Sequence, residues 1–188
     1  NKICELELTK FNNEKTKYTT LQRSTLIEFL KDKIYTQHLR FGKKIKKVSD
    51  HKDKILVNFD DNTNDLIDYL IVADGMFSST RSFFEKKNIK PKFKNAVVIR
   101  TTLKVKNILN IDEKNINLIM GSNAHLVIYP INNQNELNLV SIIREKKFNP
   151  DTINDLVNKK VLSQNLNFKN LFQGDLKSWP LYESNTAL

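Results

Sequence analysis

Short apolar runs separated by polar connectors mark the first part of the chain. Such runs predict strands, and they lie at residues 3–9, 18–21, 38–48, 55–59 and 66–73. The connectors between the last three runs are polar and turn-prone, which predicts a β-meander. Between the second and third runs, apolar residues recur at helical spacing over residues 24–34, and Ser24 is the expected N-cap of that helix.

After Pro91 the pattern predicts an antiparallel sheet with a covering helix. The strand-like runs lie at residues 95–105, 116–120, 126–131 and 137–144, and the polar turn 132–136 joins the last two as a hairpin. Asn149-Pro150-Asp151 then begins a helix of about a dozen residues. Its apolar face comprises Ile153, Leu156, Val157, Val161 and Leu162. The chain is therefore expected to be an α/β (α+β) protein with two sheets.

The segment from Asp68 to Arg81 carries the strongest functional signal. Five apolar residues, 69–73, predict a strand buried on both faces, and Asp74-Gly75 follows it directly. Gly75 lacks a Cβ, so its backbone can approach a ligand closely. Ser78 is a suitable N-cap for a helix over residues 79–87. A ligand site is expected at this strand end.

The whole string from Asp68 to Arg81 closely resembles the Asp-Gly motif of the class A FAD-dependent aromatic hydroxylases, a family that includes p-hydroxybenzoate and salicylate hydroxylases. The resemblance implies that Asp74 contacts the ribityl part of FAD and lies on the NAD(P)H route. It places Gly75 beside the cofactor and makes Arg81 the closing arginine of the motif. Without the resemblance, the segment would be an ordinary turn with a solvated aspartate.

Two weaker matches to the FAD-binding region of the same family precede this motif. Leu21-Gln-Arg23-Ser24-Thr-Leu26 is similar to the family's strand that ends in an arginine before a helix, and it implies that Arg23 reaches FAD. A guanidinium suits phosphate and ribose oxygens because it is always charged and offers several donors. The resemblance also places the backbone near Ile45, in the meander's first strand, against FAD.

A third match lies in the predicted hairpin. His125-Leu-Val-Ile-Tyr129-Pro130, followed by Asn138-Leu-Val140, resembles the substrate-domain hairpin of the salicylate and 6-hydroxynicotinate hydroxylase branch. The resemblance implies that His125 and Tyr129 face an aromatic substrate. Alternate residues of a strand share a face, so both side chains can do so. The alternative is a sheet surface on which the histidine and the tyrosine merely pack.

The resemblance implies a domain division and a reaction. Residues 1–20 would be strands shared with the substrate domain, 21–90 the central part of a glutathione-reductase-like FAD-binding domain, and 91–188 the substrate-binding domain. Such an enzyme reduces FAD with NAD(P)H and uses molecular oxygen to hydroxylate a small aromatic substrate. A ubiquinone-biosynthesis-type hydroxylase shares the Asp-Gly motif and stays an alternative, as does a non-catalytic fragment.

Two family motifs are missing from this sequence. The family's Gly-x-Gly-x-x-Gly turn has no counterpart among Gly42, Gly75, Gly121 and Gly174. Gly174-Asp175 does not occupy the place of the family's later Gly-Asp motif, which follows a segment similar to Trp179–Tyr182. We therefore expect the chain alone to be colourless and inactive, because the amides that bind FAD's pyrophosphate are missing. We also expect it to self-associate, with a homodimer as one form.

The composition of the chain leaves one other class of protein open, a basic binding module. The net charge of +10 suggests a basic module that binds nucleic acid or anionic membranes. The lysines, however, are spread along the chain as on solvated faces, and no nucleic-acid-binding motif is present, so no nucleic-acid partner is expected. No apolar run is long enough to span a bilayer. The histidines and the single Cys4 predict no metal site, and the lone cysteine favours the cytoplasm.

Overall fold

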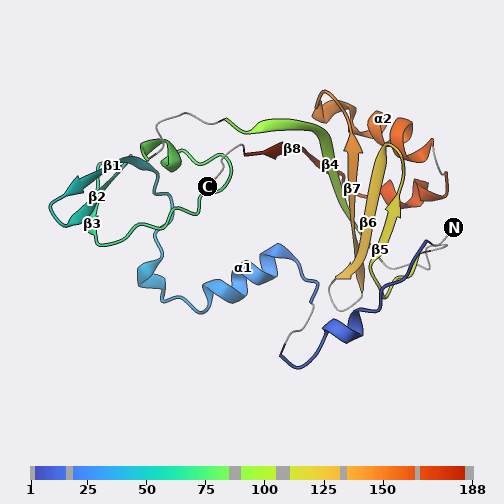
Figure 1. The fold of residues 1–188 in the computed structure, drawn as a ribbon, viewed down its shortest axis with the longest axis horizontal. Helices are drawn as coiled ribbons and strands as arrows, with labels where there is room; N and C mark the ends of the chain where they lie inside the picture. Colours follow the sequence, from blue (N-terminus) through green and yellow to red (C-terminus); the bar gives the residue numbers. More distant parts are fainter. Residues whose placement is uncertain are drawn as a thin grey trace. The chain divides into compact units, whose positions relative to one another are not determined.

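The computed structural model describes residues 3–15, 19–84, 90–104, 111–131, 135–163 and 166–184. The chain forms two compact units, each assembled from several stretches of sequence. The first unit comprises Asn1–Lys31, Val97–Arg144 and Phe148–Trp179, and the second comprises Asp32–Ala96, Glu145–Lys147 and Pro180–Leu188. Two antiparallel sheets and short helices give the α+β class that the sequence predicts (Figure 1).

The second unit contains the predicted β-meander. Its strands are β1 (Ile45–His51), β2 (Lys54–Phe59) and β3 (Asn64–Ile67), paired antiparallel in the order β1-β2-β3. The register shifts by one residue between Ile45 and Lys47, so Lys46 forms a β-bulge. The first strand begins later than predicted, because residues 36–38 form a 3-10 turn and Gly42 adopts a φ of +71°.

The predicted buried strand at residues 69–73 is wrong. The third strand ends at Ile67, and residues 68–73 have no strand partner among the described residues. Tyr69 is 88% exposed and Ile71 is 90% exposed. A strand that is apolar on both faces needs neighbours on both sides, and the described part of this chain supplies none. The helix predicted after it is a 3-10 turn, Thr80–Phe83, and residues 85–87 of that prediction lie outside the description.

The larger sheet has five strands in the order β5-β6-β7-β4-β8. Their bounds are β4 Lys92–Lys104, β5 Asn117–Met120, β6 Ala124–Ile131, β7 Glu136–Arg144 and β8 Lys177–Glu183. The first four confirm the predicted strands, although Val105 and residues 132–134 of the hairpin turn lie outside the described residues. Strand β8 was not predicted. Pro180 interrupts its pattern, and an edge strand tolerates proline because one side needs no backbone donor.

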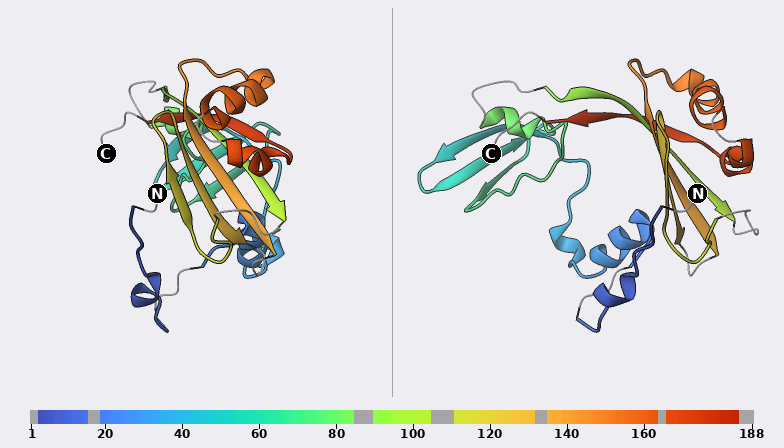
Figure 2. Two further views of the ribbon diagram at one scale, coloured as in Figure 1. Left: turned by 90° about the vertical axis from the view of Figure 1, so that its right-hand side faces the viewer. Right: turned by 45° about the vertical axis from the view of Figure 1, so that its right-hand side comes forward.

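One face of this sheet holds the main core. Helical segments run over Pro150–Thr152, α2 (Ile153–Val157) and Asn158–Leu162, and they confirm the predicted helix. The Asn149 side chain accepts a hydrogen bond from the Asp151 amide at the start. The orange and red helical segments lie against one face of the sheet in Figure 2. Fully buried core residues include Ile99, Ile128, Leu137, Leu139, Ile143 and Leu171.

The N-terminal part of the chain differs from the prediction. No strand forms over residues 3–9, where a 3-10 helix begins at Leu8, or over 19–21; Tyr18 lies outside the description. Helix α1 spans Arg23–Lys31, so Ser24 lies inside the helix rather than at its N-cap. None of the residues of α1 is buried. Among the described residues, every helix falls short of the length and apolarity that crossing a membrane requires.

Candidate functional site

The Asp74-Gly75 turn is a local structure held by its own side chains. Gly75 has a φ of +85°, a conformation that favours glycine. A Cβ on Gly75 would meet nothing within 4 Å, so the backbone here faces open space. The Thr80 amide donates to Asp74 Oδ2 at 3.4 Å, and the Arg81 amide donates to Ser78 Oγ at 3.0 Å. Ser78 thus stabilises the 3-10 turn that stands where a longer helix was predicted, although the N-cap of this turn is Ser79 rather than Ser78, and Gly75 leaves one side open.

The Asp74 carboxylate is exposed and ionised. Hydrogen bonds from the Ser78 side chain and then from Thr80 hold its pKa below the ordinary value. These donors favour the charged form because they stabilise negative charge on the oxygens. An ionised carboxylate beside an open backbone can accept hydrogen bonds from the hydroxyl groups of a ligand.

The end of β8 and the residue that follows it anchor this turn within the second unit. Arg81 donates to Ser184 Oγ at 3.2 Å, and the Phe77 and Tyr182 rings pack edge to face with centroids 5.2 Å apart. Because these contacts join segments about a hundred residues apart, the position of the Asp-Gly turn depends on the strand that sequence reasoning missed. The guanidinium of Arg81 therefore contacts the protein itself, and it helps to hold the Asp-Gly turn in place.

A second candidate surface lies in the first unit, on the face of the large sheet opposite the core; we call it the open face. Ala124, Leu126 and Ile128 of β6 enter the core, so His125, Val127 and Tyr129 project to the open face. From β7, the open face receives Asn138, Val140 and Ile142. From β5, Leu118 and Met120 lie beside Val127 and His125 in register, and both are well exposed. His125 and Tyr129 therefore share a half-buried, mostly apolar face, as predicted.

Two buried polar atoms on the open face lack hydrogen-bond partners within the described part of the chain. They are His125 Nδ1 and Asn138 Nδ2. Asn138 lies directly opposite Tyr129 in the antiparallel register. Sequence reasoning used Asn138 only as part of a motif and assigned it no role. The available signal was an asparagine in the middle of an apolar strand, where it has low β propensity.

The remaining predicted cofactor residues are dispersed. Arg23 is an exposed residue of the first turn of α1, in the first unit. Ile45 is the first residue of β1, in the second unit, and it pairs with Phe59 beside the bulge. Asp74, Gly75 and Arg81 belong to the second unit, whereas His125 and Tyr129 belong to the first. The structure thus groups the Asp-Gly residues in one turn and the two substrate residues on one strand.

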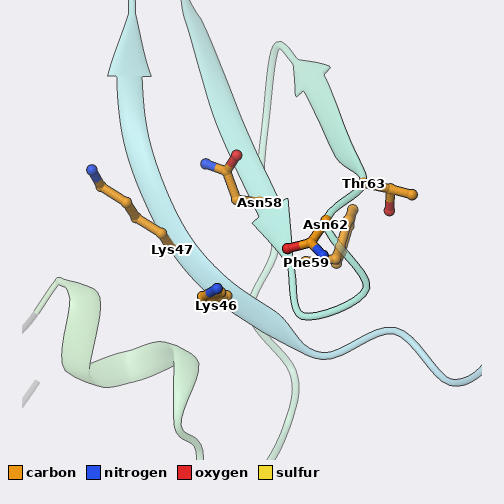
Figure 3. A pocket seen from close by; sticks show the side chains of 6 residues that line it. All are labelled: Lys46, Lys47, Asn58, Phe59, Asn62 and Thr63. Carbon is orange, nitrogen blue, oxygen red and sulfur yellow. The ribbon is translucent and has the colours of Figure 1, made fainter.

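A hollow in the β-meander contains none of these residues. It measures about 490 Å³ and is lined by Lys46, Lys47, Asn58, Phe59, Asn62 and Thr63 (Figure 3). It lies at one end of the β-meander, where the bulge and the β2–β3 turn leave space. Both lysines are exposed, and exposed lysines beside a turn are ordinary solvated surface. In the described part of the chain, no group of three or more His, Cys, Asp or Glu side chains could hold a metal ion.

Comparisons with known proteins agree on one kind of protein. No family model matches the chain. A curated relative, the FAD-dependent monooxygenase eupB of Phoma sp., is 25% identical over 181 residues, which cover 86% of this chain and 40% of the relative. Among solved structures, Klebsiella pneumoniae HpxO complexed with FAD and uric acid aligns with a TM-score of 0.76 at 15% identity, covering 86% of this chain and 43% of HpxO.

A further structural match supports the same fold. A salicylate hydroxylase in a substrate complex aligns with a TM-score of 0.68 at 14% identity, covering 86% of this chain and 46% of that chain. The chain therefore spans less than half the length of the relatives it matches. The chain is thus similar in sequence to a FAD-dependent monooxygenase, and it shares its α+β fold with the matching parts of HpxO and salicylate hydroxylase.

Proposed function

We propose that this chain is part of a FAD- and NAD(P)H-dependent monooxygenase that hydroxylates a small aromatic substrate, in the manner of salicylate and 6-hydroxynicotinate hydroxylases. The observation that carries the proposal is the open face. A histidine and a tyrosine project there from one strand among apolar neighbours. Such a face suits a flat ring that carries one or two polar substituents, because apolar side chains bind the ring and polar atoms orient it.

In this proposal, residues 91–188 supply the substrate domain and residues 21–90 the central part of the FAD domain, with residues 1–20 contributing to the substrate domain. His125 and Tyr129 hold the phenol or the carboxylate of the substrate. No side chain needs to act as a nucleophile. Bound FAD supplies the oxygen-activating chemistry, while the protein orients the ring and excludes water.

The described residues fit part of FAD. The ionised Asp74 carboxylate and the open backbone at Gly75 suit the hydroxyl groups of a ribityl chain. Arg23, an exposed cation, suits a phosphate or a ribose oxygen, and the backbone at Ile45 would border the cofactor. Arg81 would hold the Asp74-Gly75 turn in position rather than contact FAD, because its guanidinium donates a hydrogen bond to Ser184. The pyrophosphate of FAD needs further hydrogen-bond donors, and in a full-length protein these would come from segments beyond the part that this chain shares with its relatives.

The test is cofactor content and turnover in a protein that contains this chain at the full length of its relatives. We expect bound flavin with its visible absorbance, and oxidation of NADH or NADPH that is stimulated by salicylate, 6-hydroxynicotinate or uric acid. Hydroxylated product must appear with the oxidation. A colourless full-length protein, or one that binds flavin but oxidises NAD(P)H equally with and without every aromatic compound, would contradict the proposal.

Two alternatives have their own measurements. A ubiquinone-biosynthesis-type hydroxylase would act on a phenol with a polyprenyl tail and ignore the small acids. A basic binding module would shift DNA in a salt-dependent manner, because phosphate contacts release counterions. The motif His125-x-x-x-Tyr129 favours the small aromatic acids over both. We assign the protein to the cytoplasm on its single cysteine, Cys4, which is exposed and unpaired.

A further inference from the structure

Asn138 is an almost fully buried amide on the open face. Its neighbours in β7, Leu137 and Leu139, are fully buried in the core, so the Asn138 side chain must project from the other face of the sheet. The side chain of Tyr129 lies directly opposite it on β6. Facing residues of an antiparallel pair have Cβ atoms roughly 4.5–5.5 Å apart. Asn138 and Tyr129 thus form one neighbouring polar pair at the end of the open face.

The buried side-chain amide of Asn138 destabilises the ligand-free protein. The residue is only 7% exposed, and its Nδ2 has no hydrogen-bond partner among the described residues. The residues next along this face, Val127 and Val140, are apolar. A buried donor without a partner destabilises the folded state, and native proteins satisfy nearly all such groups. A leucine or valine would avoid this cost, so the unpaired amide is a candidate donor to a bound ligand.

We propose that Asn138 is a substrate-binding residue whose amide donates a hydrogen bond to an oxygen substituent of the aromatic ring held beside Tyr129. This inference rests on the proposed function and adds a residue that recognises the substrate's oxygen. The ring must carry a hydroxyl, carboxylate or oxo oxygen placed to accept from Asn138 while the apolar residues of the open face cover the ring. Aromatic hydrocarbons of the same shape bind less well, because they leave the amide unpaired.

The test compares phenol with toluene, which has the same shape without the oxygen. Binding to an isotope-labelled protein that contains this chain at the full length of its relatives is followed by NMR, using the side-chain amide signals of Asn138 and the ring signals of His125 and Tyr129. Phenol should shift the Asn138 amide signals and bind more tightly than toluene. In Asn138→Leu, phenol should bind about three- to tenfold more weakly, the effect of one lost hydrogen bond, while toluene binds as tightly as before or more tightly.

Thermal unfolding separates a binding role from a structural one. Asn138→Leu removes an unpaired buried amide, so its midpoint should equal or exceed that of the unsubstituted chain. Asn138→Val provides a second apolar replacement in case leucine does not pack. Asn135→Leu, at an exposed turn position, is the matched control and should leave the preference for phenol unchanged.

The outcomes distinguish this inference from the function on which it rests. If phenol shifts His125 and Tyr129 but both Asn138 variants keep the full preference for phenol, the role of Asn138 is wrong and the substrate face stands. A lower unfolding midpoint in both variants, with that preference unchanged, would make Asn138 a structural residue. If neither compound affects any of the three residues although the full-length protein binds flavin and hydroxylates an aromatic substrate, the open face is not the substrate site, and this inference fails while the proposed activity stands.

Discussion

Gly174 packs directly against Thr101. A Cβ built on Gly174 would lie 2.7 Å from Thr101 Oγ1 and 3.4 Å from the Thr102 carbonyl oxygen. Thr101 belongs to β4 and is 3% exposed. The glycine of the Gly174-Asp175 pair therefore has a packing role: it lets the segment before β8 approach the sheet. This contact accounts for the glycine without any cofactor.

Replacing Gly174 by alanine should destabilise the first unit. The added methyl group would overlap Thr101 Oγ1, and overpacking of this kind costs about 1–3 kcal/mol. Urea denaturation would measure the change in the free energy of unfolding. In a Thr101→Ala background the same glycine substitution should cost clearly less, because the overlapping oxygen is gone. Equal costs in both backgrounds would show that the contact with Thr101 is not the cause.

The core face and the open face of the large sheet should respond differently to truncation. Leu139 is fully buried in β7, so Leu139→Ala should lower the free energy of unfolding by about 2–5 kcal/mol. Leu118, in β5, is 62% exposed, and Leu118→Ala should change it by roughly 0.5 kcal/mol or less. Similar losses for the two variants would mean that the open face is packed as tightly as the core.

Asp61 should remain charged in unusually acidic solution. Hydrogen bonds from Lys43 and then Thr63 lower the pKa of Asp61 from 3.8 to about 2. Since the folded pKa lies below the unfolded one, this carboxylate stabilises the fold above about pH 3.8, and the contribution is lost as the pH falls toward about 2. Carboxyl-carbon NMR shifts would report the titration. Lys43→Ala should move the midpoint back toward 3.8, and an unchanged midpoint would exclude Lys43 as the main cause.

Asp74→Ala should weaken FAD retention, or slow flavin reduction by NAD(P)H, about tenfold in a full-length protein that contains this chain. The substitution removes an ionised acceptor, and hydrogen bonds to charged groups are among the stronger ones. Flavin released on dilution and single-turnover reduction would measure the two effects. Asp53→Ala changes an exposed aspartate in the β1–β2 turn of the same unit and should affect neither. Unaltered flavin content and reduction in Asp74→Ala would remove this residue from the cofactor site.

His125→Ala and Tyr129→Phe should impair aromatic substrate binding while flavin content stays unchanged. Both side chains belong to the open face of the first unit, whereas the Asp74 turn belongs to the second. Each should raise the substrate dissociation constant about three- to tenfold, the effect of one lost hydrogen bond. Substrate titration of the flavin spectrum is a direct measurement. A parallel loss of flavin and substrate would instead indicate that the hairpin is structural.

The local pattern of apolar residues correctly predicted those strands and helices that bury one face against the core and expose the other. Strand β6 alternates buried and half-buried residues over Ala124–Tyr129, and the helix at Ile153 has a regular apolar face; both elements were predicted. The strand predicted over residues 69–73 was wrong, because an unbroken apolar run does not show whether neighbouring strands exist to pair with it. Strand β8 was missed because its place depends on pairing with β4, far away in sequence. The role proposed for Asn138 rests on its register with Tyr129, which no spacing along one strand reveals.

The division of the chain into two units passes through two of its strands. Strands β4 and β8 each begin in one unit and end in the other, and they neighbour each other in the sheet. During synthesis, the second unit cannot be completed until residues after Trp179 leave the ribosome, although its meander emerges much earlier. No single cut in the polypeptide separates the two units. Expression of either unit alone would therefore require joining distant segments, and the shortest continuous piece that contains the second unit contains most of the first as well.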